Sequence, residues 1–241
     1  MLVDKKANNP AIAIGCFLQG IKLLGSAPLR RFVIMPVLIN IVLYSIAFAL
    51  GYFFLGQWID HFIPNWLQWL RWLLWPLFFS CFFGVLFFSF MLLANVLAAP
   101  FYGRLSAKTL AILTGQTSTI IEPPVAKVLW AELKRGLYFA IKAIPLLIIS
   151  FIPGVNVIAP ILWLVFGAWS MALEYTAYPM ENAGLLFSQQ KKILRSVRLG
   201  ASSFGGIAAL ALTIPVLNFI VAPAAVVGAT LFFNRLMPHR H

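Results

Sequence analysis

The chain has 241 residues, with 18 Lys and Arg against 6 Asp and Glu, and 62% of its residues are apolar. Only 10% are charged, whereas a soluble globular domain carries roughly 25%. Because the charges are missing from long continuous runs, the composition indicates an integral membrane protein and excludes a disordered or secreted chain. The two cysteines lie far apart, which argues against a disulfide framework and a cysteine metal site.

The net charge of +12 is distributed as a topology signal. The basic residues flank apolar runs and form no stripe with interleaved aromatic residues, so we expect the lipid bilayer as a partner and no nucleic acid. By the positive-inside rule, the face that carries most of the Lys and Arg is cytoplasmic. All of them except Arg71 and Lys142 share one face if that face holds residues 1–31, 103–136, 179–203 and 234–241.

Two uncharged runs are long enough to cross a bilayer. Residues 32–59 and 72–103 contain no Asp, Glu, Lys or Arg, and each exceeds the ~20 residues that span a hydrocarbon core. Tryptophans concentrate near the 55–71 connection, as in an interfacial aromatic belt. We predict two spanning helices here, preceded by an interfacial helix over residues 11–25.

Two further apolar runs are interrupted by the same motif. Residues 152–160 and 214–223 both read Ile-Pro-x-x-Asn and then reach Ala-Pro. Proline breaks a helix and asparagine can cap the backbone groups that the break frees, so the motif suits a chain that turns round inside a bilayer. The sequence therefore predicts helical hairpins over 139–178 and 204–233, with tip residues Pro153, Asn156, Pro215 and Asn218.

Arm length favours partial insertion of these hairpins. Three of the four arms have about 14–15 residues, or roughly 21–23 Å of helix, which is short of a ~30 Å hydrocarbon core. Full spans joined by short loops remain the alternative.

Residues 104–136 are too polar for the membrane and show helical apolar spacing, which predicts two amphipathic cytoplasmic helices joined by a loop. The predicted fold class is an all-α polytopic membrane protein, with a single membrane domain over residues 1–241. It has two long transmembrane helices, two proline-broken, partially inserted hairpins and amphipathic cytoplasmic helices.

Motifs of enzyme active sites are missing from the sequence. It contains no H-E-x-x-H, Ser/His/Asp or glycine-rich phosphate motif, so we expect no enzyme, no cofactor and no metal site. Glu174 is the acid in the most unusual place, near the end of a membrane helix. An ionisable residue at membrane depth is a functional candidate, and a solvated interfacial acid is the alternative.

The residues that open the first spanning helix predict an anion site. Ser26 suits the N-cap and Pro28 the first turn, so we expect the N–H groups of Leu29 and Arg30 to be unpaired within the helix. The positive end of the helix dipole then points at the interface, where Arg30 and Arg31 can present forked donors to one tetrahedral oxyanion. The alternative is that the arginines only set topology.

Over nearly its whole length the chain resembles the CysZ-type bacterial sulfate permeases. The resemblance implies a protein of the bacterial inner membrane that imports sulfate for cysteine biosynthesis and assembles as a homo-oligomer. It also favours proton dependence, for which Glu174 is the candidate. The matching residues are Arg30–Val33 with Pro36 and Asn40, Asn95–Pro100 with Phe101 and Gly103, Ile152–Gly154 with Ala159-Pro160, Leu162-Trp163 and Ala168-Trp169, Tyr175 with Tyr178-Pro179 and Asn182, and Ile214-Pro215 with Leu217-Asn218, Pro223 and Gly228–Thr230.

Members of that family bind sulfate at a Gly-Leu/Ile-Arg(-Arg) motif before the first long helix. Leu29, Arg30 and Arg31 match it, whereas Pro28 stands where the family has Gly. Proline has no N–H, so one backbone contact is absent or moved to Leu29 or Ser26. The resemblance thus implies sulfate binding by Arg30, Arg31, Leu29 and Ser26. The competing class is a non-transporting membrane scaffold.

Overall fold

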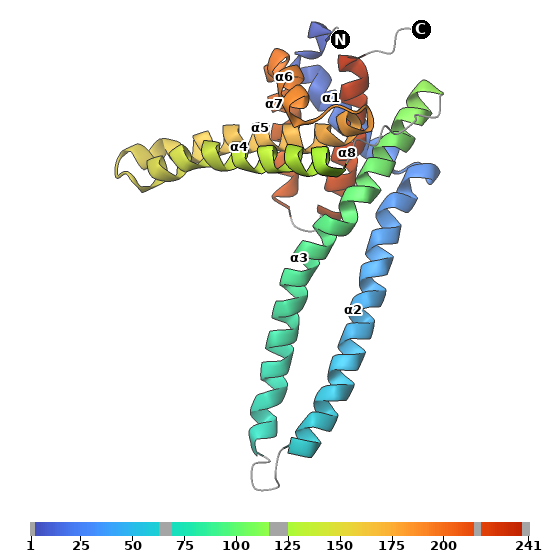
Figure 1. Ribbon diagram of the computed structural model, residues 1–241, viewed down its shortest axis with the longest axis vertical. Coiled ribbons are helices and arrows are strands. Elements are labelled where there is room, and N and C mark those ends of the chain that lie inside the picture. The colour runs from blue at the N-terminus through green and yellow to red at the C-terminus, as the bar shows by residue number, and fades with distance from the viewer. Residues whose placement is uncertain (1–2, 63–68, 116–124, 215–217, 238–241) are drawn as a thin grey trace. The chain divides into compact units, whose positions relative to one another are not determined.

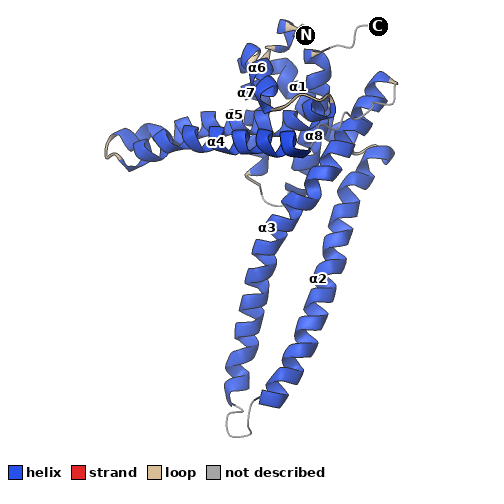
Figure 2. Cartoon of the chain, viewed as in Figure 1, coloured by secondary structure: helices blue, strands red, loops and turns tan. Residues whose placement is uncertain are grey.

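The computed structural model describes residues 3–62, 69–115, 125–214 and 218–237. The regular elements in these ranges are helices and no strand occurs in them, which confirms the all-α part of the predicted fold class (Figures 1 and 2). The α-helices are α1 Pro10–Leu24, α2 Ala27–Phe62, α3 Trp69–Thr114, α4 Val125–Phe151, α5 Ala159–Asn182, α6 Phe187–Ser196, α7 Arg198–Leu212 and α8 Asn218–Leu236, with short 3-10 helices η1 Lys5–Ala7 and η3 Val155–Ile158.

The chain forms two compact units. The smaller unit is Val33–Phe101, and the larger unit combines Met1–Phe32 with Tyr102–His241. Helices α2 and α3 each belong partly to both, because the boundaries fall inside them.

Aromatic rings join α2 to α3 within the smaller unit. Phe48 packs on Phe79 and Phe82 with ring centroids 6.2 and 5.2 Å apart, and Tyr52 packs on Trp75 at 5.1 Å. Many other large apolar side chains of this pair are exposed. Two helices with aromatic contacts between them and an apolar exterior are typical of a membrane-embedded pair.

The two long helices extend beyond the predicted spans 32–59 and 72–103. Residues 104–114, predicted as part of a separate cytoplasmic helix, are the continuous end of α3. The physical reason is local: these residues include neither proline nor glycine, so nothing stops the helix before Gly115.

Within the described residues, one helical segment is long and apolar enough to cross a membrane. It is Val155–Asn182, which comprises η3 and α5. Shorter apolar stretches, Tyr44–Phe54 and Trp72–Val85, lie within α2 and α3.

The core of the larger unit forms where α1 packs on α7 and α8, and α5 packs on the same two helices. Phe204 contacts Phe17 and Phe232, with ring centroids 6.0 and 5.8 Å apart, and all three rings are buried. Small residues let the backbones approach: a Cβ on Gly20 would lie 2.5 Å from the Ala224 carbonyl oxygen. Helix α1, predicted to be interfacial, is thus a packed member of this core.

The end of α3 is fastened to the same core. The Asn182 side-chain amide donates to the Gly103 carbonyl oxygen at 2.8 Å, and the Thr230 hydroxyl donates to Ser106 Oγ at 2.9 Å. Ser106 and Thr230 are both buried. These bonds satisfy polar groups that burial would otherwise penalise, and they hold α3 against α5 and α8.

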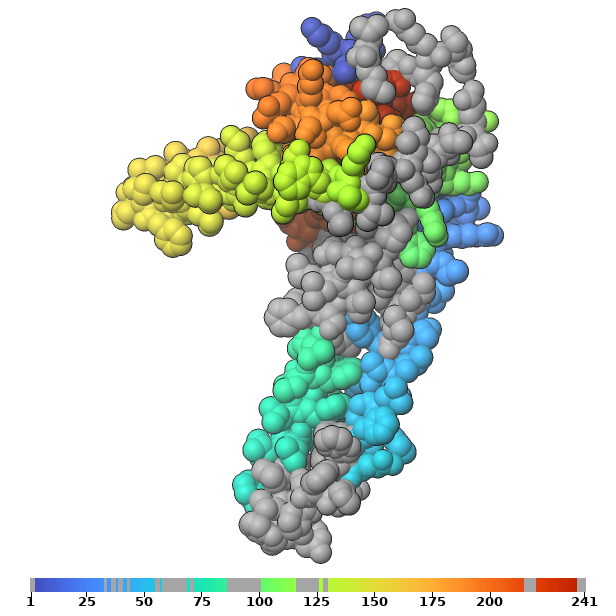
Figure 3. Space-filling view, viewed as in Figure 1, coloured from blue at the N-terminus to red at the C-terminus, as the bar shows by residue number. Residues whose placement is uncertain are grey.

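Helix pairs occupy both regions where hairpins are predicted, but α4 begins at Val125, so residues 125–136, predicted as a separate cytoplasmic helix, are continuous with the first hairpin arm. Helices α4 and α5 lie side by side and project from the rest of the larger unit (Figures 1 and 3), with Trp163 Nε1 donating to Ser150 Oγ at 3.1 Å between them. Their connection turns at Gly154, whose φ of +82° favours glycine. Helices α7 and α8 form the second pair, and Pro215 lies outside the described residues.

Adjacent glycines on α7 provide a matched test of this packing. We expect Gly205→Ala to lower the melting temperature in detergent, because its Cβ would overlap the Ala168 carbonyl oxygen of α5, and overpacking typically costs about 1–3 kcal/mol. Gly206→Ala is the control, since its Cβ would lie 3.6 Å from Ala168 Cβ, an ordinary contact. Equal melting temperatures for the two variants would contradict the close α5–α7 crossing.

Candidate anion-binding site

A two-residue connection joins α1 to α2 and positions the predicted anion-binding residues. After α1 ends at Leu24, the Ser26 N–H donates to the Leu23 carbonyl oxygen at 2.9 Å. Helix α2 then begins at Ala27, so Ser26 directly precedes the helix, where an N-cap is expected. Pro28 falls in the first turn, where the absence of its N–H removes no helical hydrogen bond.

The side chains of this first turn divide between core and surface. Leu29 is 1% exposed and anchors the turn, whereas Arg30 and Arg31 are exposed. Neither guanidinium group forms an ion pair or hydrogen bond with any residue that the structure describes. Both are therefore available to an anion.

The expectation that the N–H groups of Leu29 and Arg30 are unpaired is wrong. Both donate to the Ser26 carbonyl oxygen, at 3.1 and 3.0 Å. The reason is the helix register: Arg30 lies four residues after Ser26 and closes the first helical turn, and Leu29 adds a 3-10 bond to the same oxygen. The Ala27 N–H has no acceptor among the described residues, so a free backbone donor does exist at this end of α2.

Asn156, a predicted hairpin-tip residue, forms a hydrogen bond through its backbone and none through its side chain within the described chain. The Asn156 N–H donates to the Ile152 carbonyl oxygen at 3.0 Å, while its exposed side chain caps nothing in the described chain. Pro153 follows the end of α4. Asn218 is the first residue of α8, but its side chain, like the whole of Pro215, lies outside the described residues.

Glu174 is not an isolated carboxylate. It is half-buried on α5, and its charge reaches Glu132 and Arg135 of α4. It therefore lies beside a network of charged and polar side chains that no local sequence pattern predicts.

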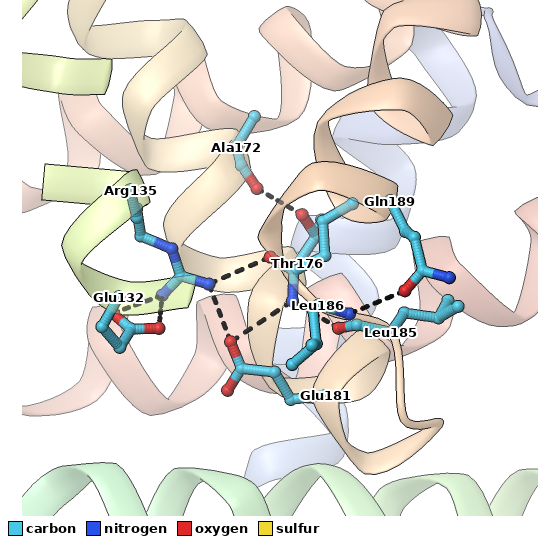
Figure 4. Close-up of polar contacts among 9 residues, drawn as sticks. Glu132, Arg135, Ala172, Thr176, Glu181, Leu185, Leu186 and Gln189 are labelled. Atoms are coloured by element: carbon cyan, nitrogen blue, oxygen red, sulfur yellow. Dashed lines mark hydrogen bonds and ion pairs between the residues drawn. The ribbon is translucent and has the colours of Figure 1, made fainter. Parts of the chain in front are cut away.

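The centre of this network is Arg135, which is 8% exposed (Figure 4). One Nη atom donates to Glu181 Oε1 at 2.7 Å and to Gln190 Oε1 at 2.9 Å. The other lies 3.0 Å from a Glu132 carboxylate oxygen. Gln190 is fully buried and donates to Glu181 Oε1 and to the Leu185 carbonyl oxygen, at 3.3 and 2.8 Å. We call Arg135, Glu181 and Gln190 the α4–α6 polar cluster, because it ties α4 to α5 and α6.

The turn after α5 gives the cluster its geometry. Gly184 has a φ of +74°, and its N–H donates to the Glu181 carbonyl oxygen at 2.8 Å, while the Leu185 N–H donates to Met180 at 2.8 Å. This pair of bonds is the Schellman ending of a helix, which requires a left-handed residue at that point. It aims the Leu185 carbonyl oxygen at Gln190 on the next helix.

The two carboxylates contribute differently to the cluster. Burial lowers the pKa of Arg135, but the Glu181 charge and hydrogen bond, helped by Glu132 and Glu174, raise it overall. For Glu132, burial raises the pKa, Arg135 lowers it, and the charges of Glu181 and Glu174 raise it further, with a net increase. The short distance to Arg135 and the raised pKa point in opposite directions, so Glu132 is the weaker partner, as its 47% exposed side chain also indicates.

Sequence spacing could not have revealed this cluster. Arg135 lies 46 residues from Glu181 and 55 from Gln190, on three different helices. The one feature of the sequence that points to these residues is the small number of acids, since Glu132 and Glu181 are two of only 6 acidic residues in the chain.

The family model described as "Sulfate transporter CysZ/Etoposide-induced protein 2.4" matches residues 16–223. The chain belongs to this family. A relative named "Sulfate transporter CysZ" from Pseudomonas aeruginosa strain PAO1 is 37% identical over 231 residues, covering 90% of this chain and 92% of the relative. Relatives of the same name from Pseudomonas fluorescens strain SBW25 and Pectobacterium atrosepticum are 42% and 38% identical, covering 90% and 93% of this chain and 89% and 85% of theirs.

Membership in this family confirms the resemblance that the sequence motifs indicate. The chain is accordingly a membrane protein. The family is named for transport and is not an enzyme family. The matched range contains the α1–α2 connection and the α4–α6 polar cluster, so both lie within the family's common region.

Proposed function

We propose that this protein imports sulfate across the bacterial inner membrane and so supplies cysteine biosynthesis. The carrying observation is that relatives named as sulfate transporters align with about nine-tenths of the chain at 37–42% identity. The exposed, unpaired arginines at the start of α2 fall within the aligned family range.

Sulfate is a tetrahedral dianion, and the start of α2 offers donors of the right kind. Arg30 and Arg31 supply charged, forked donors, and the helix dipole adds positive potential at the same place. The Ser26 hydroxyl and the Ala27 N–H are further donors. Leu29 acts as a positioning residue through its buried side chain, because its N–H is already bonded to Ser26.

For the membrane topology, we propose that α2 and α3 are two long spans and that the α4–α5 and α7–α8 pairs are two partially inserted hairpins. The repeated proline motifs and the short arms counted from the sequence support partial insertion. Polar hairpin tips inside the bilayer must be shielded from lipid by other protein, which supports a homo-oligomer. Light scattering in mild detergent should then give a multiple of the 26.8 kDa chain mass, and a strict monomer would contradict it.

Thiol labelling tests whether the hairpin tips are re-entrant. After removal of Cys16 and Cys81, a single cysteine at Asn156 or Asn218 should react slowly with a membrane-impermeant reagent added outside, because a re-entrant tip does not reach that side. A cysteine in the 60–65 connection is the accessible control. Rapid, complete labelling at both tips would show full spans instead.

Without a nucleotide-binding motif, the chain is either a channel-like permease or an ion-coupled carrier. We propose proton coupling through Glu174, which is half-buried on the apolar helix α5 beside other carboxylates. A carboxylate at such a depth can bind and release a proton during transport.

Uptake of radiolabelled sulfate into sealed vesicles tests the function directly. We expect uptake above that of protein-free vesicles, stimulated by an inward proton gradient, and Glu174→Gln should abolish the stimulation. The same uptake with and without the gradient would exclude proton coupling. No uptake under either condition, together with no thermal stabilisation by sulfate, would favour a membrane scaffold, which has no reason to bind a small dianion.

A further inference from the structure

Exposed basic side chains gather at one end of the larger unit, beside the first described residues of the chain and the end of α8. We propose that this basic end binds the anionic headgroups of membrane phospholipids. The proposal rests on the membrane placement given above but on a surface separate from Arg30 and Arg31. The basic end consists of Lys5, Lys6, Lys192, Arg195, Arg198 and Arg235, all of them exposed.

Backbone contacts bring these residues together from four segments. The Asp4 N–H donates to the Leu236 carbonyl oxygen at 3.0 Å, which joins η1 to the end of α8. The Gly200 N–H donates to Asn8 Oδ1 at 3.2 Å, which joins the start of α7 to η1. Only Val197 separates α6 from α7. Figures 1 and 3 show α6 close to the N-terminal residues.

The positive charge of the basic end is not neutralised. No Asp or Glu follows Glu181 in the sequence, and the nearby Asp4, which accepts the Lys6 backbone N–H at 2.9 Å, brings one negative charge against six positive ones. None of the six basic side chains forms an ion pair with a described residue. Arg235 approaches a neutral partner, Gln19 Oε1, at 3.5 Å. Six unpaired cations on one surface attract a partner that carries several negative charges.

The apolar run between these charges indicates the depth at which they lie. Residues 199–234 contain no Asp, Glu, Lys or Arg, and Arg198 and Arg235 stand at its two ends. Because both arms of the α7–α8 pair leave the hydrocarbon at these ends, the arginines reach the level of the lipid phosphates. Leu199, 64% exposed, lies next to Arg198 and suits the boundary with the acyl chains.

Helix α6 lies over this boundary without inserting into it. It buries Phe187, Ile193 and Leu194 against the protein, so the face that it leaves open is polar and carries Lys192 and Arg195. A basic, amphipathic segment at the cytoplasmic end of membrane helices is the sequence pattern that anionic lipids recognise. Charge and depth together therefore select phospholipid headgroups over a soluble acidic protein.

Lipid binding to purified protein in neutral detergent tests the proposal. Phosphatidylglycerol should bind, as counted by native mass spectrometry, and phosphatidylcholine should not. The variant Lys192→Gln/Arg195→Gln should bind phosphatidylglycerol roughly thirtyfold more weakly, because each basic residue near a lipid surface is worth about fivefold, that is about 1 kcal/mol. The matched control is Lys108→Gln/Lys127→Gln, which removes one exposed charge from α3 and one from α4; it should bind like the parent.

A charge-preserving variant, competition with inorganic phosphate and a sulfate-binding measurement complete the test. Lys192→Arg/Arg195→Lys keeps both charges and should bind like the parent, which separates charge from folding. Equal phosphatidylglycerol binding by the Gln variant and the parent, equal binding of phosphatidylcholine, or displacement by millimolar inorganic phosphate would each overturn the proposal. Sulfate binding is measured on the same samples. Parent protein that binds phosphatidylglycerol but not sulfate would contradict the proposed substrate while the lipid surface stands, and the reverse result would contradict only the lipid surface.

Discussion

Arg30→Ala and Arg31→Ala should each weaken sulfate binding roughly ten- to a hundredfold. Each guanidinium group is exposed and makes no ion pair within the described chain, so its full charge is available to the dianion. A hydrogen bond to a charged group is worth about 1.5–3 kcal/mol, which converts to that range of affinity. Equilibrium binding of labelled sulfate to detergent-purified protein measures the loss.

Controls separate binding from topology. Lys108→Ala and Lys127→Ala remove exposed charges elsewhere and should leave the affinity unchanged. Lys191 is unsuitable as a control because its ammonium group lies over the Tyr138 and Phe187 rings, at 4.9 and 5.4 Å, and supports packing.

Lysine substitution gives the sharper comparison, since Arg30→Lys and Arg31→Lys keep the positive-inside signal but lose the planar fork. Partial loss of affinity is expected. If the lysine variants bind like the parent and the alanine variants fail only in membrane insertion, the arginines set topology and sulfate binds elsewhere.

Arg135→Met should produce the largest loss of stability. It removes the donor that pairs Glu181 with the fully buried Gln190, and breaking a buried ion pair costs roughly 3–5 kcal/mol. Because Glu181 is 35% exposed and part of its charge is solvated, we expect the lower end, about 3 kcal/mol. That corresponds to a melting temperature lower by roughly 6–12 °C for a chain of this size. Thermal unfolding in detergent measures it.

A second substitution tests whether the loss comes from unpaired charge. Adding Glu181→Gln to Arg135→Met should recover part of the stability, because the less exposed of the two carboxylates that Arg135 pairs is then neutral, while Glu132, with a 47% exposed side chain, is solvated by water. A double variant that is no more stable than Arg135→Met would show that packing, and not charge, is responsible. A single variant that unfolds at the parent's temperature would contradict the cluster altogether.

Glu132→Gln is the internal control, and its sign follows from the pKa. Burial and the neighbouring carboxylates raise the folded-state pKa of Glu132 above its ordinary value of 4.5, so the folded protein holds this proton more tightly than the unfolded chain does. The stability that this group contributes is present below the ordinary pKa and is lost as the pH rises through the raised folded-state value. At neutral pH, glutamine should therefore be neutral or slightly stabilising.

The sequence alone determined the membrane class, the helical fold, the positions of the proline-broken connections and the arginine pair that opens α2. All of these depend on signals within a few tens of residues: uncharged run length, helix breakers and capping residues. The same local signals identified the family motifs. They misjudged the first turn of α2, where helix register assigns the N–H groups of Leu29 and Arg30 to the Ser26 carbonyl oxygen.

Only the tertiary structure decided which distant side chains meet. In the folded protein, Arg135 lies beside Glu181 and Gln190. Helices α5 and α7 cross closely at Gly205, whereas Gly206 has room for a Cβ. Helix α1 packs in the core of the larger unit. In an all-helical membrane protein, almost every surface is apolar, so hydropathy does not distinguish a face that contacts lipid from one that contacts another helix. Helix packing depends on the shapes of residues far apart in the chain, and that information appears only when the helices are assembled.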